Sequence, residues 1–258
     1  MTPLDWMDVS DLSFRSLLLL ERVQLSWLPR WISPRELGIA LRANPVVTWY
    51  VTHKCPEIAA WVEQVLRDAP LSEDPHAAEV EVMRQMVDML VYVVDPSVYD
   101  AQPFLAWDSR ELTDLVDFTG ATVLDIGSGT GRLTLVAAQR AAVVFAVEPV
   151  ENLRRYLREK ARGRGLRNVY PVDGLVTDIP FPDGFSDITI GGHVFGDDPE
   201  AEIREVLRVT RAGGTVIACP GNGDVDNETH DVFRAHGFEW GTFEEPRDGV
   251  KRKYWKRV

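Results

Sequence analysis

The chain has little cysteine, and this scarcity limits its redox and metal chemistry. Cys55 and Cys219 are the two cysteines among 258 residues. Two cysteines so far apart cannot build a disulfide framework. His53 and Cys55 lie close in sequence, but together with Lys54 they supply too few ligands for a zinc site. We therefore expect no metal.

Long apolar runs are also missing. A membrane span needs roughly 20 predominantly apolar residues, whereas the densest run here, the four leucines at 17–20, lies between Arg15 and Glu21. This run indicates the apolar face of a helix, so we expect no membrane partner. The N-terminus shows no basic stretch followed by an apolar segment and a cleavage site, and we therefore expect a cytoplasmic location.

Positive charge is in deficit, because 28 Lys and Arg stand against 40 Asp and Glu and give a net charge of −12. An acidic surface repels phosphate backbones, which argues against nucleic acid as a bulk partner. The basic cluster at residues 251–257 is expected to be a solvated terminal strand. The acidic excess is greatest before residue 116 and favours a neutral or cationic substrate. Oligomeric state leaves no signal in the sequence.

The pattern of apolar residues changes along the chain and divides it into residues 1–115 and 116–258. The first part shows apolar residues at helical spacing, for example over 58–66, in segments broken by prolines. The second part alternates short apolar β-rich runs with helical patterns, which is typical of a doubly wound parallel sheet. We predict an N-terminal helical domain that covers the site and selects the substrate, followed by a ligand-binding sheet domain.

The second part defines the expected fold class, α/β. Five parallel strands are predicted at residues 122–126, 143–147, 169–172, 188–191 and 215–219, and helices near 132–140, 151–162, 199–210 and 228–236. Residues 238–244 and 253–258 form a hairpin about the turn Arg247-Asp248-Gly249. The prediction is thus a doubly wound Rossmann-like sheet of five parallel strands plus a C-terminal β-hairpin. Such an ending differs from the six parallel strands of the dinucleotide fold.

A glycine turn follows the first predicted strand, in the sequence Asp125-Ile126-Gly127-Ser128-Gly129-Thr130-Gly131. Glycines let the backbone approach a ligand closely, and the following helix offers free N–H groups. The spacing differs from the GxGxxG dinucleotide fingerprint, because Arg132 takes the later position. The second strand ends at Glu148, about 20 residues beyond the turn, where a carboxylate can accept hydrogen bonds from a ribose diol.

These motifs resemble those of the class I S-adenosylmethionine (SAM)-dependent methyltransferases. The resemblance covers nearly all of residues 116–258. It includes the segment Ile179-Pro180-Phe181-Pro182-Asp183-Gly184 before the fourth strand and residues 204–214 before the fifth. Both are similar to segments of the small-molecule, type 11 branch, which contains quinone-biosynthesis enzymes. The resemblance implies transfer of a methyl group from SAM to a small-molecule acceptor, with S-adenosylhomocysteine as the product.

The resemblance also implies which residues hold the cofactor. The expected contacts are Asp125, Gly127, Ser128, Gly129, Glu148, Asp173, Gly174, Leu175, Val176, Gly191 and Gly192. One position departs from the family, because Leu175 stands where an aspartate usually binds the adenine amino group. Either Asp173 replaces that aspartate from a shifted position, or apolar packing and the Val176 backbone hold the adenine.

His193 follows Gly191-Gly192 at the expected mouth of the site and is the candidate general base, because imidazole suits proton removal near neutral pH. A hydrogen-bonded loop histidine is the alternative. Two other functions remain open at this point. A non-catalytic SAM-binding module would keep the glycine turn without an acceptor pocket. A nicotinamide-dependent oxidoreductase would need the GxGxxG spacing and a sixth parallel strand.

Overall fold

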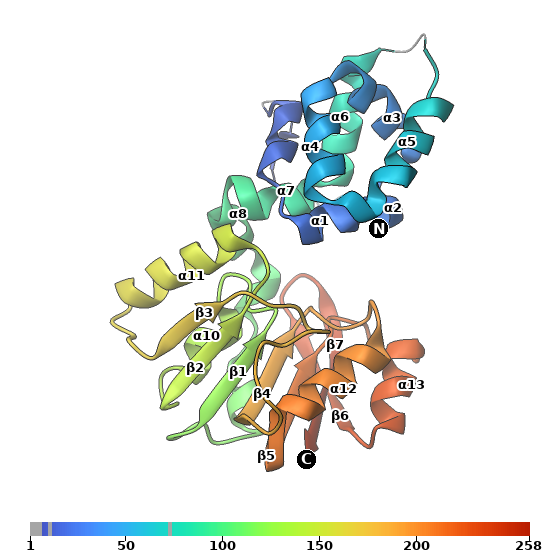
Figure 1. Cartoon of the computed structure of the whole chain (residues 1–258). Helices are drawn as coiled ribbons and strands as arrows, with labels where there is room; N and C mark the ends of the chain where they lie inside the picture. The colour runs from blue at the N-terminus through green and yellow to red at the C-terminus, as the bar shows by residue number, and fades with distance from the viewer. Residues whose placement is uncertain (1–6, 10–11, 72–73) are drawn as a thin grey trace. The chain divides into compact units, whose positions relative to one another are not determined.

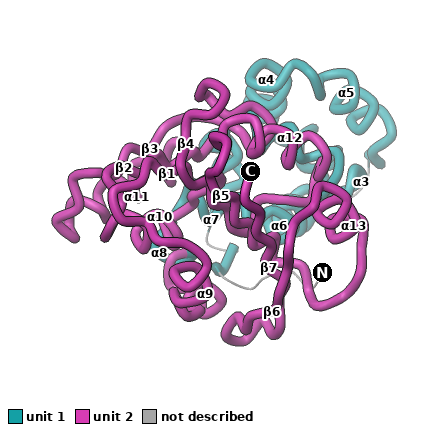
Figure 2. Tube along the Cα trace, turned by 90° about the horizontal axis from the view of Figure 1, so that it is seen from below, with its two compact units in different colours: residues 1–99 teal, residues 100–258 magenta. Residues whose placement is uncertain are grey.

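A computed structural model describes residues 7–9, 12–71 and 74–258, and it divides the chain into two compact units. Figure 2 colours them separately, with residues 1–99 as one unit and residues 100–258 as the other. The boundary therefore falls earlier than the one expected at residues 115 and 116. Residues 100–115 belong to the unit that contains the sheet.

The first unit is helical, as Figure 1 shows. Its described elements are η2 (Phe14–Leu19), α1 (Arg22–Ser26), α2 (Leu28–Trp31), α3 (Pro34–Ala43), α4 (Pro45–Lys54), η3 (Pro56–Ile58), α5 (Ala59–Asp68), α6 (Pro75–Gln85), α7 (Val87–Val94) and α8 (Pro96–Asp100), whose last residue begins the second unit.

Prolines explain where several of these helices begin. Pro34, Pro45 and Pro75 occupy first-turn positions, where a missing backbone N–H costs nothing. The first three leucines of the run lie in the 3₁₀ helix η2 and Leu20 follows as its C-cap; Leu17 and Leu20 are buried. In the part of the chain that the structure describes, no helix has both the length and the apolar character of a membrane span.

The second unit contains one sheet of seven strands, β1 (Thr122–Ile126), β2 (Val143–Val147), β3 (Val169–Val172), β4 (Ser186–Gly192), β5 (Thr210–Cys219), β6 (Glu239–Glu245) and β7 (Gly249–Arg257). Their order is β3-β2-β1-β4-β5-β7-β6. The first five strands pair in parallel, whereas β7 pairs antiparallel with both β5 and β6. The predicted fold class is confirmed, and the antiparallel edge replaces the sixth parallel strand that a dinucleotide fold would need.

Three helices connect parallel strands: α10 (Arg132–Ala137) joins β1 to β2, α11 (Glu151–Gly163) joins β2 to β3, and α12 (Pro199–Val209) joins β4 to β5. A fourth helix, α13 (Glu228–Ala235), leads from β5 to the edge strand β6. Asp198 and Asn227 accept hydrogen bonds from backbone N–H groups in the first turns of α12 and α13 and so fix where these helices begin. Each helix begins within two residues of its predicted position.

Residues before β1 complete the core of the sheet unit. They form η4 (Pro103–Ala106) and α9 (Arg110–Thr113), and the side chains of Trp107 and Leu112 are buried against the sheet. The Trp107 ring lies 5.3 Å from the ring of Phe243 on β6, and Lys253 on β7 binds the Glu111 carboxylate at 2.5 Å. These contacts explain why the compact unit begins before residue 116.

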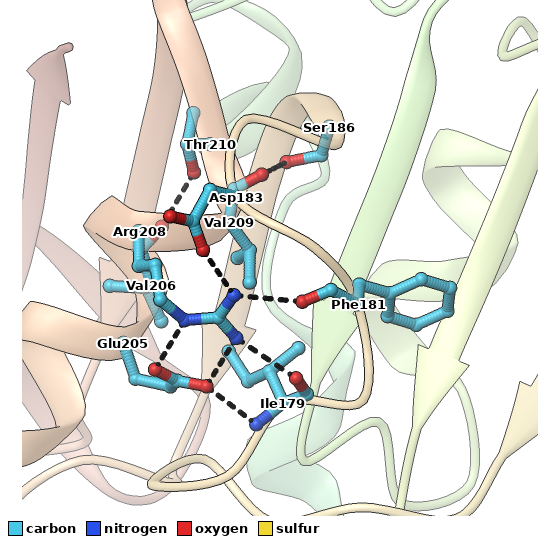
Figure 3. A network of polar contacts seen from close by, with 9 residues as sticks. All are labelled: Ile179, Phe181, Asp183, Ser186, Glu205, Val206, Arg208, Val209 and Thr210. Carbon is cyan, nitrogen blue, oxygen red and sulfur yellow. Dashed lines mark hydrogen bonds and ion pairs between the residues drawn. The ribbon is translucent and has the colours of Figure 1, made fainter.

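Arg208 fixes the loop that leads into β4, as Figure 3 shows. Its guanidinium donates to the carbonyl oxygens of Ile179 and Phe181 and to the Asp183 and Glu205 carboxylates, over 2.6 to 3.1 Å. The planar fork of arginine suits several acceptors at once. This segment, whose sequence resembles the methyltransferase family, is therefore held by α12.

Candidate active site

The carboxyl ends of β1 and β4 lie side by side at the centre of the sheet. Ile126 at the end of β1 pairs with Gly191 on β4. The strand order reverses here, because β2 and β3 extend to one side of β1, whereas β4 and β5 extend to the other. Ligands of open α/β sheets bind at such a switch point. The glycine turn, Glu148 and His193 all follow strands that end at this edge.

The glycine turn has a backbone that other residues resist. Gly127, Gly129 and Gly131 have positive φ values of 64°, 51° and 90°. The N–H groups of Gly127 and Ser128 donate to the Val147 carbonyl at 2.9 and 3.1 Å and tie the turn to the end of β2. A Cβ atom on Gly127 would come within 2.6 Å of Val194. The turn is therefore fixed by both backbone conformation and packing.

Two polar atoms in this turn are buried without a hydrogen-bond partner among the described residues. They are Oδ1 of Asp125 and Oγ of Ser128. The other Asp125 oxygen accepts from the Thr134 hydroxyl on α10. Buried polar groups are nearly always paired, so two orphan groups in one turn indicate a polar ligand. The residues present therefore fit a nucleoside cofactor.

Glu148 is held at the top of β2 by two backbone donors. Its Oε2 accepts from Gly129 N–H at 2.9 Å and its Oε1 from Val150 N–H at 3.0 Å. The residue is 5% exposed. Each carboxylate oxygen can accept a further bond. Glu148 can thus accept bonds from ribose hydroxyls while it remains bound to the glycine turn.

Glu148→Ala should weaken SAM binding by about ten- to a hundredfold, because hydrogen bonds to a charged acceptor contribute about 1.5–3 kcal/mol. Isothermal titration with S-adenosylhomocysteine measures this loss. Glu151→Ala, at the exposed start of α11, is the matched control and should leave the affinity unchanged. A loss below about threefold for Glu148→Ala would show that the carboxylate does not hold the ribose.

Burial raises the pKa of Glu148 to about 7, and it raises the pKa of Asp125 to about 7 as well. If the ionised Glu148 carboxylate binds the ribose, affinity should decrease as the pH falls below 7, by up to about tenfold per pH unit. Titration with 5′-methylthioadenosine between pH 5.5 and 8 tests this, because that ligand has the ribose but no titratable amino acid. Glu148→Gln should flatten the profile. A flat wild-type profile would contradict the prediction.

Residues 173–175, which follow β3, differ in their contacts and in their exposure. The Asp173 carboxylate binds Arg154 at 2.8 Å, and its side chain is 76% exposed. Arg154 also donates to the Glu148 carbonyl at 2.7 Å. Gly174 packs so tightly that a Cβ would come within 2.6 Å of Pro180. Leu175 is 39% exposed. At the expected adenine edge the chain thus exposes an apolar side chain, while Asp173 supports Arg154.

His193 lies where β4 ends, in a left-handed conformation with φ of 56°. Its backbone N–H donates to the Cys219 carbonyl at 2.8 Å, and its Nε2 lies 2.7 Å from Oε1 of Glu245. The next residue, Val194, contacts Gly127 of the glycine turn. The structure therefore places His193 beside the glycine turn. Gly192, just before it, packs near Leu133 of α10.

Hydrogen bonds and an ion pair hold residues 100–107 near the C-terminal end of the glycine turn, which the sequence did not predict in detail. Lys160 on α11 binds the Asp100 carboxylate at 2.5 Å and donates to the Thr130 carbonyl at 3.2 Å. Arg132 donates to the carbonyl oxygens of Leu105 and Trp107. Asp100, Leu105 and Trp107 are therefore held beside the C-terminal end of the turn. These partners are distant in sequence, so no local pattern marks them.

Sequence reasoning also missed Glu245. It is the last residue of β6, directly before the hairpin turn, and its partner His193 lies 52 residues away. The one available signal is a carboxylate directly after the strand predicted at residues 238–244. No group of three or more potential metal ligands occurs among residues 7–9, 12–71 and 74–258.

The chain is similar in sequence to methyltransferases. Residues 124–218 match the family model described as "Methyltransferase domain". The chain is 30% identical over 129 residues to a demethylmenaquinone methyltransferase of Geobacillus stearothermophilus. The aligned region covers 47% of this chain and 54% of that protein. It is 26% identical over 167 residues to an uncharacterized methyltransferase of Geobacillus thermodenitrificans, covering 61% and 73% of the two chains.

The chain spans about half the length of the Geobacillus stearothermophilus enzyme, or 54%. Among solved structures, a chain in the complex of the Haloferax volcanii Trm112 methyltransferase activator with a methyltransferase is similar, with a TM-score of 0.51, 16% identity and coverage of 65% of this chain and 94% of that one. This likeness concerns the fold. The predicted resemblance to class I SAM-dependent methyltransferases is confirmed.

Proposed function

We propose that this chain, which carries a class I methyltransferase domain, transfers the methyl group of SAM to a small-molecule acceptor and releases S-adenosylhomocysteine. The observation that carries the proposal is the glycine turn at the switch point of the sheet, with Glu148 bonded to Gly129 N–H. Buried polar atoms of Asp125 and Ser128 in this turn have no hydrogen-bond partner among the described residues. The cofactor would supply a methyl group activated by its bond to a positive sulfur.

The chain's own residues would hold this cofactor from three sides. The ribose hydroxyls would bind Glu148, and the methionine part would lie along Gly127, Gly129, Gly191 and Gly192. The adenine would pack on Leu175 and Val176, because the Asp173 carboxylate is already paired with Arg154. Asp125 and Ser128 would then gain the polar partners that they lack among the described residues.

His193 would act at the acceptor. Methyl transfer of this kind is an in-line displacement with a neutral leaving group, so the protein mainly aligns the acceptor and, where needed, removes its proton. The imidazole is a base with a suitable working range. Phe104 of the 100–107 segment lies 5.4 Å from the His193 ring, which supplies an apolar wall beside the base.

A methyl-incorporation assay tests the proposed function. The full chain is incubated with SAM that carries a radioactive methyl group and with a metabolite extract, and labelled products are separated by size. Label in small molecules is the expected result. Binding of S-adenosylhomocysteine without any transfer would instead favour the non-catalytic module. Binding of NADH in place of S-adenosylhomocysteine would favour the oxidoreductase.

We assign substrate selection to the N-terminal helical unit. Because the structure begins the sheet unit at residue 100, the fragment 100–258 should bind S-adenosylhomocysteine within about threefold of the full chain but lose methyl transfer. The fragment 116–258 is the comparison. It lacks the buried side chains of Trp107 and Leu112 and should unfold at a lower temperature. Full transfer activity in the fragment 100–258 would contradict the assignment.

A further inference from the structure

Glu245 is a buried carboxylate whose burial is not explained by stability. Its side chain is 0% exposed. Within the described residues the side chain has one polar partner, the Nε2 atom of His193 at 2.7 Å, and its Oε2 has none. Burying a carboxylate costs free energy unless it is paired and hydrogen-bonded. A buried carboxylate at the end of the edge strand β6, with only one of its two oxygens hydrogen-bonded among the described residues, therefore indicates a function.

The charge of this pair is balanced in one state. An ionised carboxylate beside a neutral imidazole leaves a buried negative charge, whereas beside an imidazolium the two charges cancel. An ionised carboxylate only accepts hydrogen bonds, so the proton of a neutral His193 lies on Nε2 and the lone pair on Nδ1. The arrangement suits a histidine that receives a proton at Nδ1 during the reaction.

The rest of the environment holds the imidazole in one place. A Cβ on Gly221 would come within 2.5 Å of Nδ1, so a side chain at residue 221 would cover that edge of the ring. Gly221 belongs to a loop fixed to β7, because Arg252 N–H donates to the Asn222 carbonyl at 3.1 Å. The centroid of the Phe104 ring lies 5.4 Å from the centroid of the His193 ring.

We propose that Glu245 is a positioning residue, which orients His193 and supplies the counter-charge when Nδ1 takes a proton from the methyl acceptor. This inference rests on the proposed methyl transfer. The acceptor class follows from it: the methylated atom carries a hydrogen, as a hydroxyl does. As the new bond from that atom to the methyl carbon forms and the carbon–sulfur bond breaks, the acceptor's proton passes to Nδ1 and later to solvent.

Nitrogen-15 NMR of the full chain tests the pair without any acceptor. We expect a His193 ring proton on Nε2 that is shifted downfield and protected from exchange, because hydrogen bonds to ionised acceptors are the stronger ones. Loss of the signal in His193→Asn assigns it. Glu245→Gln, which keeps the volume but removes the charge, should move the signal upfield and speed its exchange. Glu244→Gln, one residue earlier and exposed, is the matched control.

Two results would overturn the inference. One is a protected proton on Nδ1, and the other is an unchanged His193 signal in Glu245→Gln. Titration with S-adenosylhomocysteine separates this failure from that of the proposed function. If Glu245→Gln binds it within about twofold of the wild type, the cofactor site is intact and the NMR result concerns the pair alone. If the wild type does not bind it, the proposed function fails first.

Discussion

Gly129→Val is expected to lower SAM affinity at least about a hundredfold, which corresponds to about 2.7 kcal/mol. Gly129 has a φ of 51°, a left-handed conformation that β-branched residues rarely adopt. Forcing it there costs about 1–3 kcal/mol, so the turn should change its path. The N–H of Gly129 would then leave the Glu148 carboxylate, to which it donates at 2.9 Å. Titration with S-adenosylhomocysteine measures the loss.

A second glycine provides the control for backbone strain. Gly120 also has positive φ, at 71°, and a Cβ there would meet no atom within 4 Å. Gly120→Val should thus cost a similar amount of stability while the affinity stays unchanged. Thermal unfolding of both variants checks that the comparison is fair. Equal affinities for Gly129→Val and the wild type would remove the glycine turn from the cofactor site.

Replacing His193 with asparagine should reduce kcat at least about a hundredfold, because a positioned base contributes about 10² to 10⁴ in rate. Asparagine is chosen because it tolerates the left-handed backbone of this position, φ 56°, and lacks a basic nitrogen. The affinity for S-adenosylhomocysteine should stay within about twofold, since His193 lies beyond the glycine turn. Steady-state turnover with the acceptor found in the incorporation assay measures the effect.

His236→Asn serves as the control for this variant. His236 follows α13 and pairs with Glu200 on the surface, at 2.9 Å. Its replacement should leave turnover unchanged. If His193→Asn stayed within about tenfold of the wild type, His193 would be a wall of the pocket and the acceptor would be activated elsewhere.

The local architecture of the sheet unit could be predicted from the sequence. The strands at Thr122–Ile126, Val143–Val147 and Val169–Val172 match their predicted bounds. Buried parallel strands are continuous apolar runs, and their ends are marked by turn residues. β5 was predicted too short, at 215–219, because it begins at Thr210 and runs through Ala212-Gly213-Gly214, residues with little strand propensity. Thr210 pairs with Ser186 of β4, and a register shift separates this pair from the pair of Ile188 and Thr215.

The site divides in the same way between local and distant information. The glycine turn, Glu148 and His193 each follow a strand directly, so their place at one edge of the sheet depends on sequence order and on parallel pairing alone. The role of Asp173 could not be decided from sequence, where it competed with the Val176 backbone for the adenine. In the structure the Asp173 carboxylate pairs with Arg154 on α11, which lies 19 residues earlier in the chain.

By itself, the sequence determined the fold class, the order of strands and helices, and the edge of the sheet where the cofactor is expected, because these follow from hydrophobic period, turn residues and glycine spacing. Only the tertiary structure decided that the sheet unit begins at Asp100 and that Glu245 meets His193. The physical reason is that burial and pairing between residues dozens of positions apart depend on how strands and loops pack, and no local pattern encodes that distance.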